Sequence, residues 1–374
     1  MNAIERLRAT YELRPVDRLV RREFYIWPEA IERWKAEGMP QDVPQAELFG
    51  FDEPASAGIG RLGWCEPEFV PAIEDRVLEE TADYQVVRDR AGRAVKFFRG
   101  RRHGFMPTYL KHAVTCEKDW AKDVLPRLRP ETPERWAGIE KDLARLRAAE
   151  AEGKRIVLGG IGGYMYLRAL VGPEEVCYLL VDNPRLVHAM MEAWLALAEA
   201  VAERVQRAVT IDEVFLAEDI CYNHGLLISP DMVREFLFPY YRRLLDGVRR
   251  RQNARKLYFH LDTDGNCAEA VGLYREISLG AMSPFEVAAG NDVVAVARRH
   301  PDLVISGGID KRVLAAGPEA IDAHLAHILP PMVARGGYIP TCDHGVPDDV
   351  SYANYLHYRR RVMEMGTCCH DRHR

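Results

Sequence analysis

The sequence predicts an α/β protein built as a single (β/α)8 barrel with an inserted β-hairpin near its amino terminus. From about residue 156 onward, short apolar runs alternate with stretches of 3.6-residue periodicity, and strand followed by helix, repeated, indicates a parallel sheet. Residues 77–98 instead alternate with a period of two around a turn, which is typical of a hairpin. Acidic or imidazole side chains follow most of the apolar runs, where parallel barrels bind their ligands.

Each strand and helix is assigned from its own pattern. Six apolar runs are typical of buried strands, and they occupy residues 156–158, 214–216, 257–259, 281–282, 303–305 and 338–339. Periodic stretches typical of helices occupy residues 184–205, 230–249, 292–299, 318–328 and 354–365. Residues 22–27, followed by a helical pattern at 28–36, supply a seventh strand and helix. One strand of the eight is not located by any pattern.

The segment 76–125 differs from the barrel pattern. Its hairpin turns at Asp89-Arg90-Ala91-Gly92, and a proline-rich stretch at 125–133 is typical of a linker leading back into the barrel. We therefore treat residues 1–374 as one barrel domain in which 76–125 form an inserted hairpin and linker.

Composition excludes two classes of partner. The 374 residues carry 51 Lys and Arg against 56 Asp and Glu, a net charge of -5, so the positive field that nucleic acid requires is missing. No stretch approaches the ~18 apolar residues of a membrane span, and the first 22 residues are charged throughout. The eight cysteines show no CxxC pair, as expected of reduced thiols. We expect a cytoplasmic protein.

Two acids follow the run 214–216. Glu218 and Asp219 are candidates for acid/base catalysis, for metal binding or for orienting a substrate by hydrogen bonds. The alternative is that Asp219 starts a turn and only Glu218 points inward.

Three titratable residues follow or end the run 257–259. Alternation along a strand places His260, Asp262 and Asp264 on one face, and Gly265 allows a sharp turn after them. Two carboxylates this close raise one another's pKa unless a cation or hydrogen bonds compensate them, and a divalent metal is the simplest compensation. The alternative is a helix N-cap made by Asp264 or Asn266.

The remaining strand ends add to this set. Glu286 is expected at the mouth; Gly307 and Gly308 permit close approach of backbone to a ligand, and Lys311 can hold an anion. His344 is the strongest single candidate for a ligand or proton carrier, although an exposed histidine is often only a solvated loop residue. The convergence of five acidic or imidazole strand ends on one face favours a functional site.

The same segments resemble a known superfamily. The matching stretches are residues 218–222 with 227–230, 262–266, 284–292, 307–312 and 336–355. They are similar to the uroporphyrinogen decarboxylase-like superfamily, which includes the haem-pathway decarboxylase and the corrinoid-dependent methyltransferases, and most of all to its non-haem branch. The resemblance covers nearly the whole chain and implies a (β/α)8 barrel.

Within the methyltransferase branch, the resemblance implies a zinc ion held by a His-x-Cys-Gly-Asn motif and by a later Cys-Gly turn. On this chain the first motif falls on Asp262 and Asp264, and the second on His344, so both thiolates are replaced. The implied site is oxygen-rich and suits a divalent metal, zinc more than manganese or iron(II).

A corrinoid such as cobalamin is the second implied cofactor. It would approach over the barrel mouth, where Tyr164, Gly307, Gly308 and Lys311 are the candidate binding residues. The haem-pathway enzyme matches less well, because its Arg-Gln-Ala-Gly-Arg signature is absent and residues 21–24 stand in its place. We therefore expect that this protein is not a porphyrinogen decarboxylase.

The resulting hypothesis is a metal-assisted, corrinoid-linked methyltransferase acting on a small substrate. Asp262, Asp264 and His344 would hold the metal. Glu218, Asp219 and Glu286 would be the catalytic acids, bases or outer ligands. A small corrinoid protein is an expected partner, and a homodimer remains open. Two alternatives stay open: a metal-dependent lyase or decarboxylase of a small carboxylic acid, and a non-catalytic binding barrel.

Overall fold

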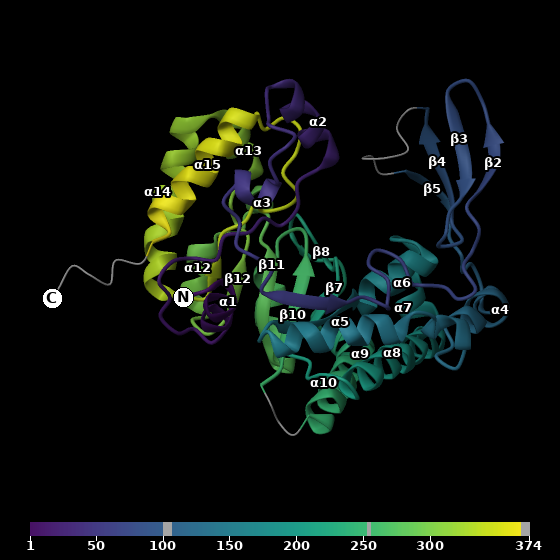
Figure 1. Cartoon of the computed structure of the whole chain (residues 1–374). Helices are drawn as coiled ribbons and strands as arrows, with labels where there is room; N and C mark the ends of the chain where they lie inside the picture. Colours follow the sequence, from purple (N-terminus) through teal and green to yellow (C-terminus); the bar gives the residue numbers. More distant parts are fainter. Residues whose placement is uncertain (100–106, 253–255, 368–374) are drawn as a thin grey trace.

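The centre of the molecule is a seven-stranded parallel sheet (Figure 1). The computed structural model describes residues 1–99, 107–252 and 256–367. The strand order is β1-β6-β7-β10-β11-β12-β13, and every neighbouring pair is parallel. These strands are β1 (Ser56–Ile59), β6 (Arg155–Ile161), β7 (Glu213–Ala217), β10 (Tyr258–Thr263), β11 (Leu279–Pro284), β12 (Val304–Ser306) and β13 (Tyr338–Ile339).

All six strands expected after residue 155 are confirmed, but a closed eight-stranded barrel is not. In the described ranges, β1 and β13 end the strand order without pairing with each other, so the sheet is a curled, open half-barrel. The expected strand at 22–27 is wrong: this stretch makes one isolated bridge, from Ile26 to Val346, before Pro28 starts a helix. Strand β1, with the short sequence Ser-Ala-Gly-Ile, carries too weak a pattern to be recognised from sequence.

Helices connect the strands of the sheet and pack against it. The α-helices are α1 (Ala3–Tyr11), α2 (Pro28–Ala36), α3 (Gln45–Leu48), α4 (Glu117–Asp119), α5 (Ile139–Ala151), α6 (Gly163–Val171), α7 (Glu175–Asp182), α8 (Pro184–Gln206), α9 (Pro230–Phe236), α10 (Phe238–Arg251), α11 (Ala268–Tyr274), α12 (Val293–Arg299), α13 (Lys311–Ala316), α14 (Pro318–Arg335) and α15 (Tyr352–Met365). Shorter helical turns are η1 (Trp120–Val124), η2 (Leu125–Arg127), η3 (Pro133–Trp136), η4 (Arg275–Ile277) and η5 (Val287–Ala289).

Helix boundaries follow local chemistry. The longest helix, α8, starts where Asn183 accepts a hydrogen bond from the Leu186 amide and Pro184 takes the first helical position. The helix expected at 230–249 is instead two helices, α9 and α10, that meet at Leu237. Pro239 explains the break, because a proline ring clashes with the carbonyl four residues earlier.

The hairpin expected at 77–98 is present as part of a separate antiparallel sheet, drawn at the upper right of Figure 1. Its order is β2-β3-β4-β5, with β2 (Arg76–Glu80), β3 (Tyr84–Arg88), β4 (Ala94–Phe98) and β5 (Thr108–Lys111). The Asp89 carboxylate closes the turn by accepting from the amides of Ala91 and Arg93. Residues 100–106 of the expected insertion lie outside the described residues. Whether the sheet is an insertion relative to other proteins stays a prediction.

Helix α1 lies across the amino-terminal end of the sheet. Its Leu7 and Tyr11 pack against Tyr258, Ala281 and Ile339 from three strands. Burying this apolar contact closes the lower end of the half-barrel and leaves the carboxyl ends of the strands for chemistry.

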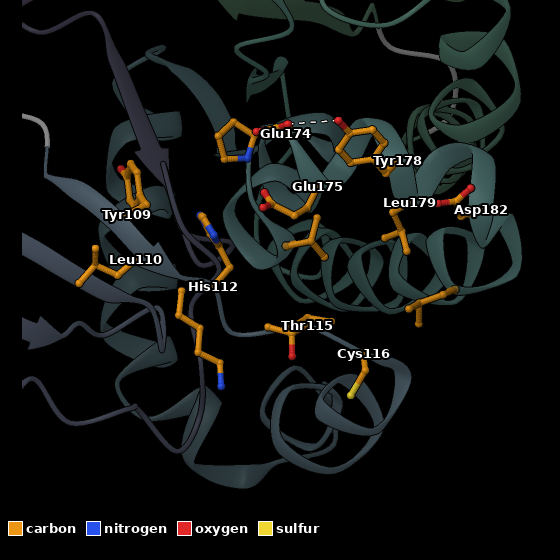
Figure 2. Close-up of a pocket in the computed structure, with 15 residues that line it drawn as sticks. Tyr109, Leu110, His112, Thr115, Cys116, Glu174, Glu175, Tyr178, Leu179 and Asp182 are labelled. Carbon is orange, nitrogen blue, oxygen red and sulfur yellow. Dashed lines mark hydrogen bonds between the residues drawn. The ribbon is translucent and has the colours of Figure 1, made fainter.

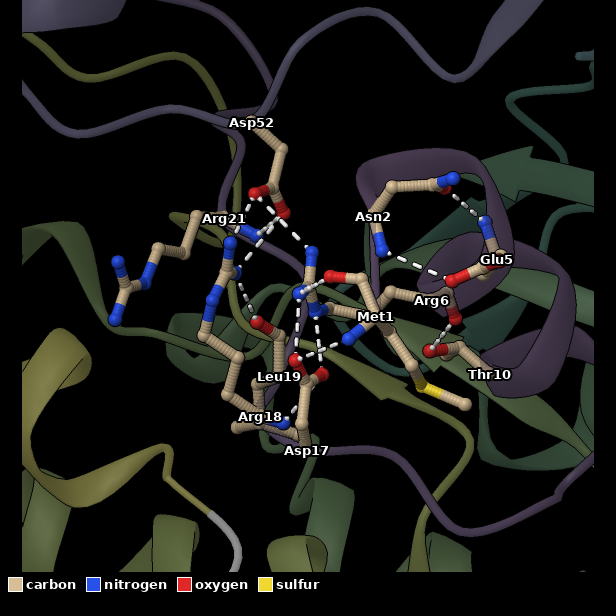
Figure 3. Close-up of polar contacts among 10 residues, drawn as sticks. All are labelled: Met1, Asn2, Glu5, Arg6, Thr10, Asp17, Arg18, Leu19, Arg21 and Asp52. Atoms are coloured by element: carbon tan, nitrogen blue, oxygen red, sulfur yellow. Dashed lines mark hydrogen bonds and ion pairs between the residues drawn. The ribbon is translucent and has the colours of Figure 1, made fainter.

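A polar network fixes the start of the chain (Figure 3). Arg6 pairs with Asp17 at 2.8 Å and with Asp52 at 3.5 Å, and Arg18 also binds Asp52. The Asp52 carboxylate further accepts from the Arg21 amide. Because these residues come from α1, the loop after it and the segment after α3, the network holds α1 in its place. None of the helices formed by the described residues combines the length and apolarity needed to cross a bilayer.

Candidate active site

Asp264 and His344 form an ion pair at the carboxyl ends of the strands. Asp264 directly follows β10, and its Oδ2 lies 3.4 Å from Nε2 of His344, which follows β13. Trp27 stacks on the imidazole, with ring centroids 6.1 Å apart, and Phe24 lies at the same distance. The hydrogen bond with Asp264 raises the pKa of His344 against the opposing effect of burial. This arrangement favours a protonated, oriented imidazole.

Glu286 and Lys311 form a second ion pair beside the first. The Lys311 ammonium lies 2.8 Å from Oε1 of Glu286, whose other oxygen accepts from the Gly265 amide at 3.0 Å. Beneath them, the fully buried Asp343 accepts from the backbone amides of Val287 and Lys311. Burial raises the pKa of Asp343. Sequence reasoning did not single out Asp343, and its position directly before His344 was the available signal.

Asp219 supplies a third ion pair. It adopts a left-handed backbone conformation, with φ of 47°, and its carboxylate pairs with Arg168 at 3.2 Å. It also accepts from the Asp264 amide at 3.4 Å. Burial, and then the charge of Asp264, raise the pKa of Asp219. Arg168 from α6 was missed because a single arginine within a helical pattern gives no sign that it reaches a strand end.

Glu218 does not join this cluster. Its carboxylate is fully buried between the sheet and the covering helices, where it accepts from the hydroxyls of Tyr241 at 2.6 Å and Tyr274 at 3.0 Å. Burial raises the pKa of Glu218 to about 7 in spite of these hydrogen bonds. The alternative in which only Glu218 points inward is therefore wrong, because Asp219 reaches the strand-end cluster and Glu218 does not.

Asp262 reaches the cluster from inside β10. In register it lies between Ala217 of β7 and Ser283 of β11, and its Oδ2 lies 2.5 Å from the Ser283 hydroxyl. Burial raises the pKa of Asp262 to about 6, against the lowering effect of the Ser283 hydrogen bond. Asp262 is thus a carboxylate that takes up a proton at a higher pH than an ordinary aspartate does.

The expected three-ligand metal centre does not fit the structure. Within the described ranges, no group of three or more His, Cys, Asp or Glu side chains is arranged so that it could hold a metal ion. The carboxylate of Asp262 turns to Ser283, while Asp264 turns to His344. We therefore assign no metal to these residues. Asn266 accepts a hydrogen bond from the Ala268 amide at 3.2 Å. The N-cap of α11 is nevertheless Cys267, without a side-chain cap hydrogen bond, so the N-cap alternative is wrong for both Asp264 and Asn266.

The glycines expected to admit a ligand are closely packed against the protein itself. Gly307 and Gly308 have φ of 118° and 77°. A Cβ at Gly307 would lie 1.8 Å from the Pro284 carbonyl oxygen, and one at Gly308 would lie 2.3 Å from the Val293 side chain. Tyr164 is also fully buried, and its amide donates to Glu218. A ligand-binding role for these three residues stays a prediction, and only Lys311 of the expected cofactor residues lies in the cluster.

A separate cavity lies between β5 and α7 (Figure 2). Its volume is about 730 Å³, and residues such as His112, Glu175 and Asp182 line it. Tyr178, on its rim, donates to Glu174 at 3.1 Å. None of the residues predicted for the site lines this cavity.

Acidic, basic and imidazole side chains gather at the carboxyl ends of the parallel strands, which is where parallel α/β barrels bind their ligands. The family model for uroporphyrinogen decarboxylase (URO-D) matches residues 86–365. The chain therefore belongs to the uroporphyrinogen decarboxylase family, whose wider superfamily consists of enzymes.

Curated relatives are similar to this chain in sequence, and a solved structure is similar to it in fold. Uroporphyrinogen decarboxylase of Ectopseudomonas mendocina is 26% identical over 256 residues, covering 64% of this chain and 67% of the relative. The enzyme of Azotobacter vinelandii is 28% identical over 197 residues, covering 51% and 52%. The chain thus spans about half to two thirds of these relatives. A methyltransferase from Methanosarcina mazei shares the fold, with a TM-score of 0.55, 15% identity and coverage of 97% and 99%.

Proposed function

We propose that this protein is a lyase that removes carbon dioxide from a small carboxylic acid by proton transfer. The observation that carries the proposal is that Asp262 and the Asp264–His344 ion pair both lie at the carboxyl ends of the strands. The pKa of Asp262 is raised to about 6, and the pKa of His344 is raised by Asp264. Near neutral pH His344 acts as the imidazolium acid of the reaction, and Asp262 is a second titratable group at the same strand ends.

The cations of the cluster provide a binding site for the substrate carboxylate. Arg168 and Lys311 each make one ion pair, and both side chains are about one quarter exposed. A guanidinium carries five N–H donors and an ammonium three, so donors remain after each pairing. Charge-assisted hydrogen bonds of this kind hold and orient carboxylates.

In the proposed reaction, the carbon–carbon bond to the substrate carboxylate breaks and carbon dioxide leaves. The electron pair that remains on carbon takes a proton from the His344 imidazolium, and solvent later restores that proton. Asp264 keeps the imidazole oriented and favours its charged form. Proton transfer from a positioned side chain contributes ~10²–10⁴-fold to a rate. No step passes through a metal ion, because the residues do not fit one.

Release of carbon dioxide from a panel of small carboxylic acids tests the proposal. With a substrate identified, His344→Asn should lower kcat by ~10²–10⁴-fold. The matched control is His357→Asn, because His357 forms a similar ion pair with Asp322 at 2.9 Å outside the site. The control should retain the wild-type rate. Equal loss in both variants, or full activity of His344→Asn, would contradict the assignment of His344 as the acid.

Methyl transfer with a corrinoid is the second candidate. The match of this chain with a methyltransferase over nearly the full length of both favours it. A corrinoid difference spectrum separates the two candidates, because only methyl transfer requires a cobamide to bind. If a cobamide binds and no acid tested releases carbon dioxide, methyl transfer is favoured over decarboxylation. A small corrinoid protein as partner, a homodimer and a cytoplasmic location remain predictions.

A further inference from the structure

Phe215 stands in the middle of β7, on the face of the sheet that carries Asp262. In register it lies between Gly159 of β6 and His260 of β10. Its ring packs edge-on against the His260 imidazole, with ring centroids 4.6 Å apart. Side chains alternate along a strand, so Asp262, two residues after His260, lies on this same face nearer the carboxyl end. The Phe215 ring is therefore a neighbour of the candidate site.

The indole of Trp64 lies over the Phe215 ring. The two rings are nearly parallel, with an interplanar angle of 9° and centroids 5.4 Å apart. Trp64 belongs to the loop after β1, and it is 49% exposed in spite of this contact. An indole gains hydrophobic stabilisation when it is buried, so half of that gain is left unused here. Trp64 thus presents a large flat apolar surface to solvent next to the candidate site.

The strands beside Phe215 carry no side chain at this level of the face. Gly58 and Gly60 are exposed, Gly159 is partly exposed, and none of the three has a positive φ. A Cβ at these positions would lie 3.5, 3.8 and 4.0 Å from the nearest atoms, so packing leaves room for one. The pairing of β6 with β1 and β7 also runs without a bulge. Strand glycines with neither cause often mark the close approach of a ligand.

A cation lies at the carboxyl end of the same strand. Asp219 comes four residues after Phe215, and its carboxylate pairs with Arg168 at 3.2 Å. Four extended residues span at most ~14 Å, a distance that the side chains at both ends shorten, so one small molecule can reach both places. Arg168 is about one quarter exposed and has donors left after its ion pair. The open aromatic surface and this cation together suit a ligand with a flat ring and an anionic end.

We propose that Trp64 is a specificity-determining residue, and that the substrate is an aromatic carboxylic acid whose ring stacks on the Trp64 indole while Arg168 binds its carboxylate. The inference rests on the proposed function for the carboxylate, and it adds the chemical class of the group that carries this carboxylate. Stacked aromatic rings gain free energy beyond that of area burial. A flat ring can also lie close to strands that bear only glycine, beside Gly159.

Calorimetric titration of the full chain with matched pairs of acids tests the role of Trp64. The probes are benzoate and phenylpropionate, each compared with the acid in which a cyclohexane ring replaces the phenyl ring. We expect each aromatic acid to bind ~3- to 10-fold more tightly than its saturated counterpart. Trp64→Ala should abolish this preference, and Trp64→Phe should keep most of it. Tyr178→Ala is the control, because Tyr178 is a 60% exposed aromatic residue outside the site.

Three results of these titrations would overturn the proposal. They are a lack of binding by both aromatic acids, equal affinities within each pair, and an unchanged preference in Trp64→Ala. If the indole only shielded Phe215 from water, Trp64→Ala would lower the Tm without changing the ratio of affinities within a pair. The ratio therefore separates recognition of a ring from a merely structural role.

Filling the space beside Phe215 gives a second measurement. Gly159→Val adds a branched side chain where a Cβ has room, and valine favours strands. We expect an unchanged or higher Tm together with at least ~10-fold weaker binding of both aromatic acids. Gly272→Val is the matched control, since Gly272 is exposed in α11 and its Cβ would meet nothing within 4 Å. Full affinity in Gly159→Val would show that the ring does not lie there.

The two proposals can fail separately, because the titrations need no turnover. If aromatic acids bind through Trp64 and no acid releases carbon dioxide, the proposed reaction is wrong and the binding site stands. If carbon dioxide is released only from aliphatic acids and the aromatic acids do not bind, the substrate class is wrong and the reaction stands. If Gly159→Val does not fold, the ratios measured in Trp64→Ala and Trp64→Phe decide alone.

Discussion

The side chains of Asp264 and His344 meet at 3.4 Å although they follow strands β10 and β13, which are separated by β11 and β12 in the sheet. Neighbouring strands lie about 4.8 Å apart, so three strand spacings in a flat sheet would hold these residues well beyond contact. Their ion pair therefore depends on the curl of the sheet and on the loops that lead inward from its carboxyl edge.

This pair makes a prediction about protonation. Asp264→Asn should lower the pKa of His344 toward its ordinary value, as measured by histidine NMR, because the hydrogen bond to Asp264 raises it. A raised folded-state pKa gives a stabilisation that is complete at low pH and disappears as pH rises through that pKa. Asp322→Asn is the control, since Asp322 pairs with His357 instead. An unchanged His344 titration in Asp264→Asn would contradict the pairing.

The buried Glu213 makes a prediction about stability. Glu213→Ala should reduce the free energy of unfolding by about 3–5 kcal/mol in urea titrations, because Arg155 is left as an unpaired buried charge. Glu203→Ala, which removes an exposed ion pair with Arg207, should cost well under 1 kcal/mol. Because the pKa of Glu213 is lowered to about 2, its stabilisation is present above pH ~4.5 and is lost as pH falls toward 2.

The double glycine makes a prediction about packing. Gly307→Ala should destabilise the fold more than Gly317→Ala, although both glycines have φ of about 116–118°. Backbone strain, on the order of 1–2 kcal/mol, is common to both variants. Only Gly307 also places a new Cβ against the Pro284 carbonyl. Thermal unfolding measures the difference, and equal destabilisation would show that the contact with Pro284 is unimportant.

Because the described residues offer no fitting set of metal ligands, we predict that the protein holds no stoichiometric metal ion. Protein purified without chelators should contain far less than one equivalent of zinc, manganese or iron, measured by elemental analysis. Asp262→Ala should leave that content unchanged, because Asp262 is bound to Ser283. A stoichiometric metal that is lost in Asp262→Ala would instead restore the metal-assisted hypothesis.

The last prediction concerns uroporphyrinogen, after which the curated relatives are named. We expect no decarboxylation of uroporphyrinogen, because residues 21–24 replace the Arg-Gln-Ala-Gly-Arg signature. A relative such as the Ectopseudomonas mendocina enzyme serves as the positive control under the same conditions. Conversion by this chain at a comparable rate would make it a porphyrinogen decarboxylase and would replace the substrate class proposed here.

Sequence periodicity located the strands of the second half of the sheet because each is a buried run flanked by turns. It could not show that Glu218 and Asp219, adjacent in sequence, occupy different environments. Adjacent residues of extended chain point to opposite faces, and the left-handed backbone at Asp219 changes the direction of the chain as well. The hydroxyls of Tyr241 in α10 and Tyr274 in α11 then donate hydrogen bonds to the Glu218 carboxylate.

The sequence by itself determined the parallel α/β architecture, the family and the edge of the sheet at which the polar residues gather, since these depend on local periodicity and on the direction of parallel strands. Only the tertiary structure decided which partner each carboxylate binds. Asp262 binds Ser283, Asp264 binds His344 and Asp219 binds Arg168. Each partner comes from a distant part of the chain, and ångström-scale distances between such parts are set by how the sheet curls and the helices pack.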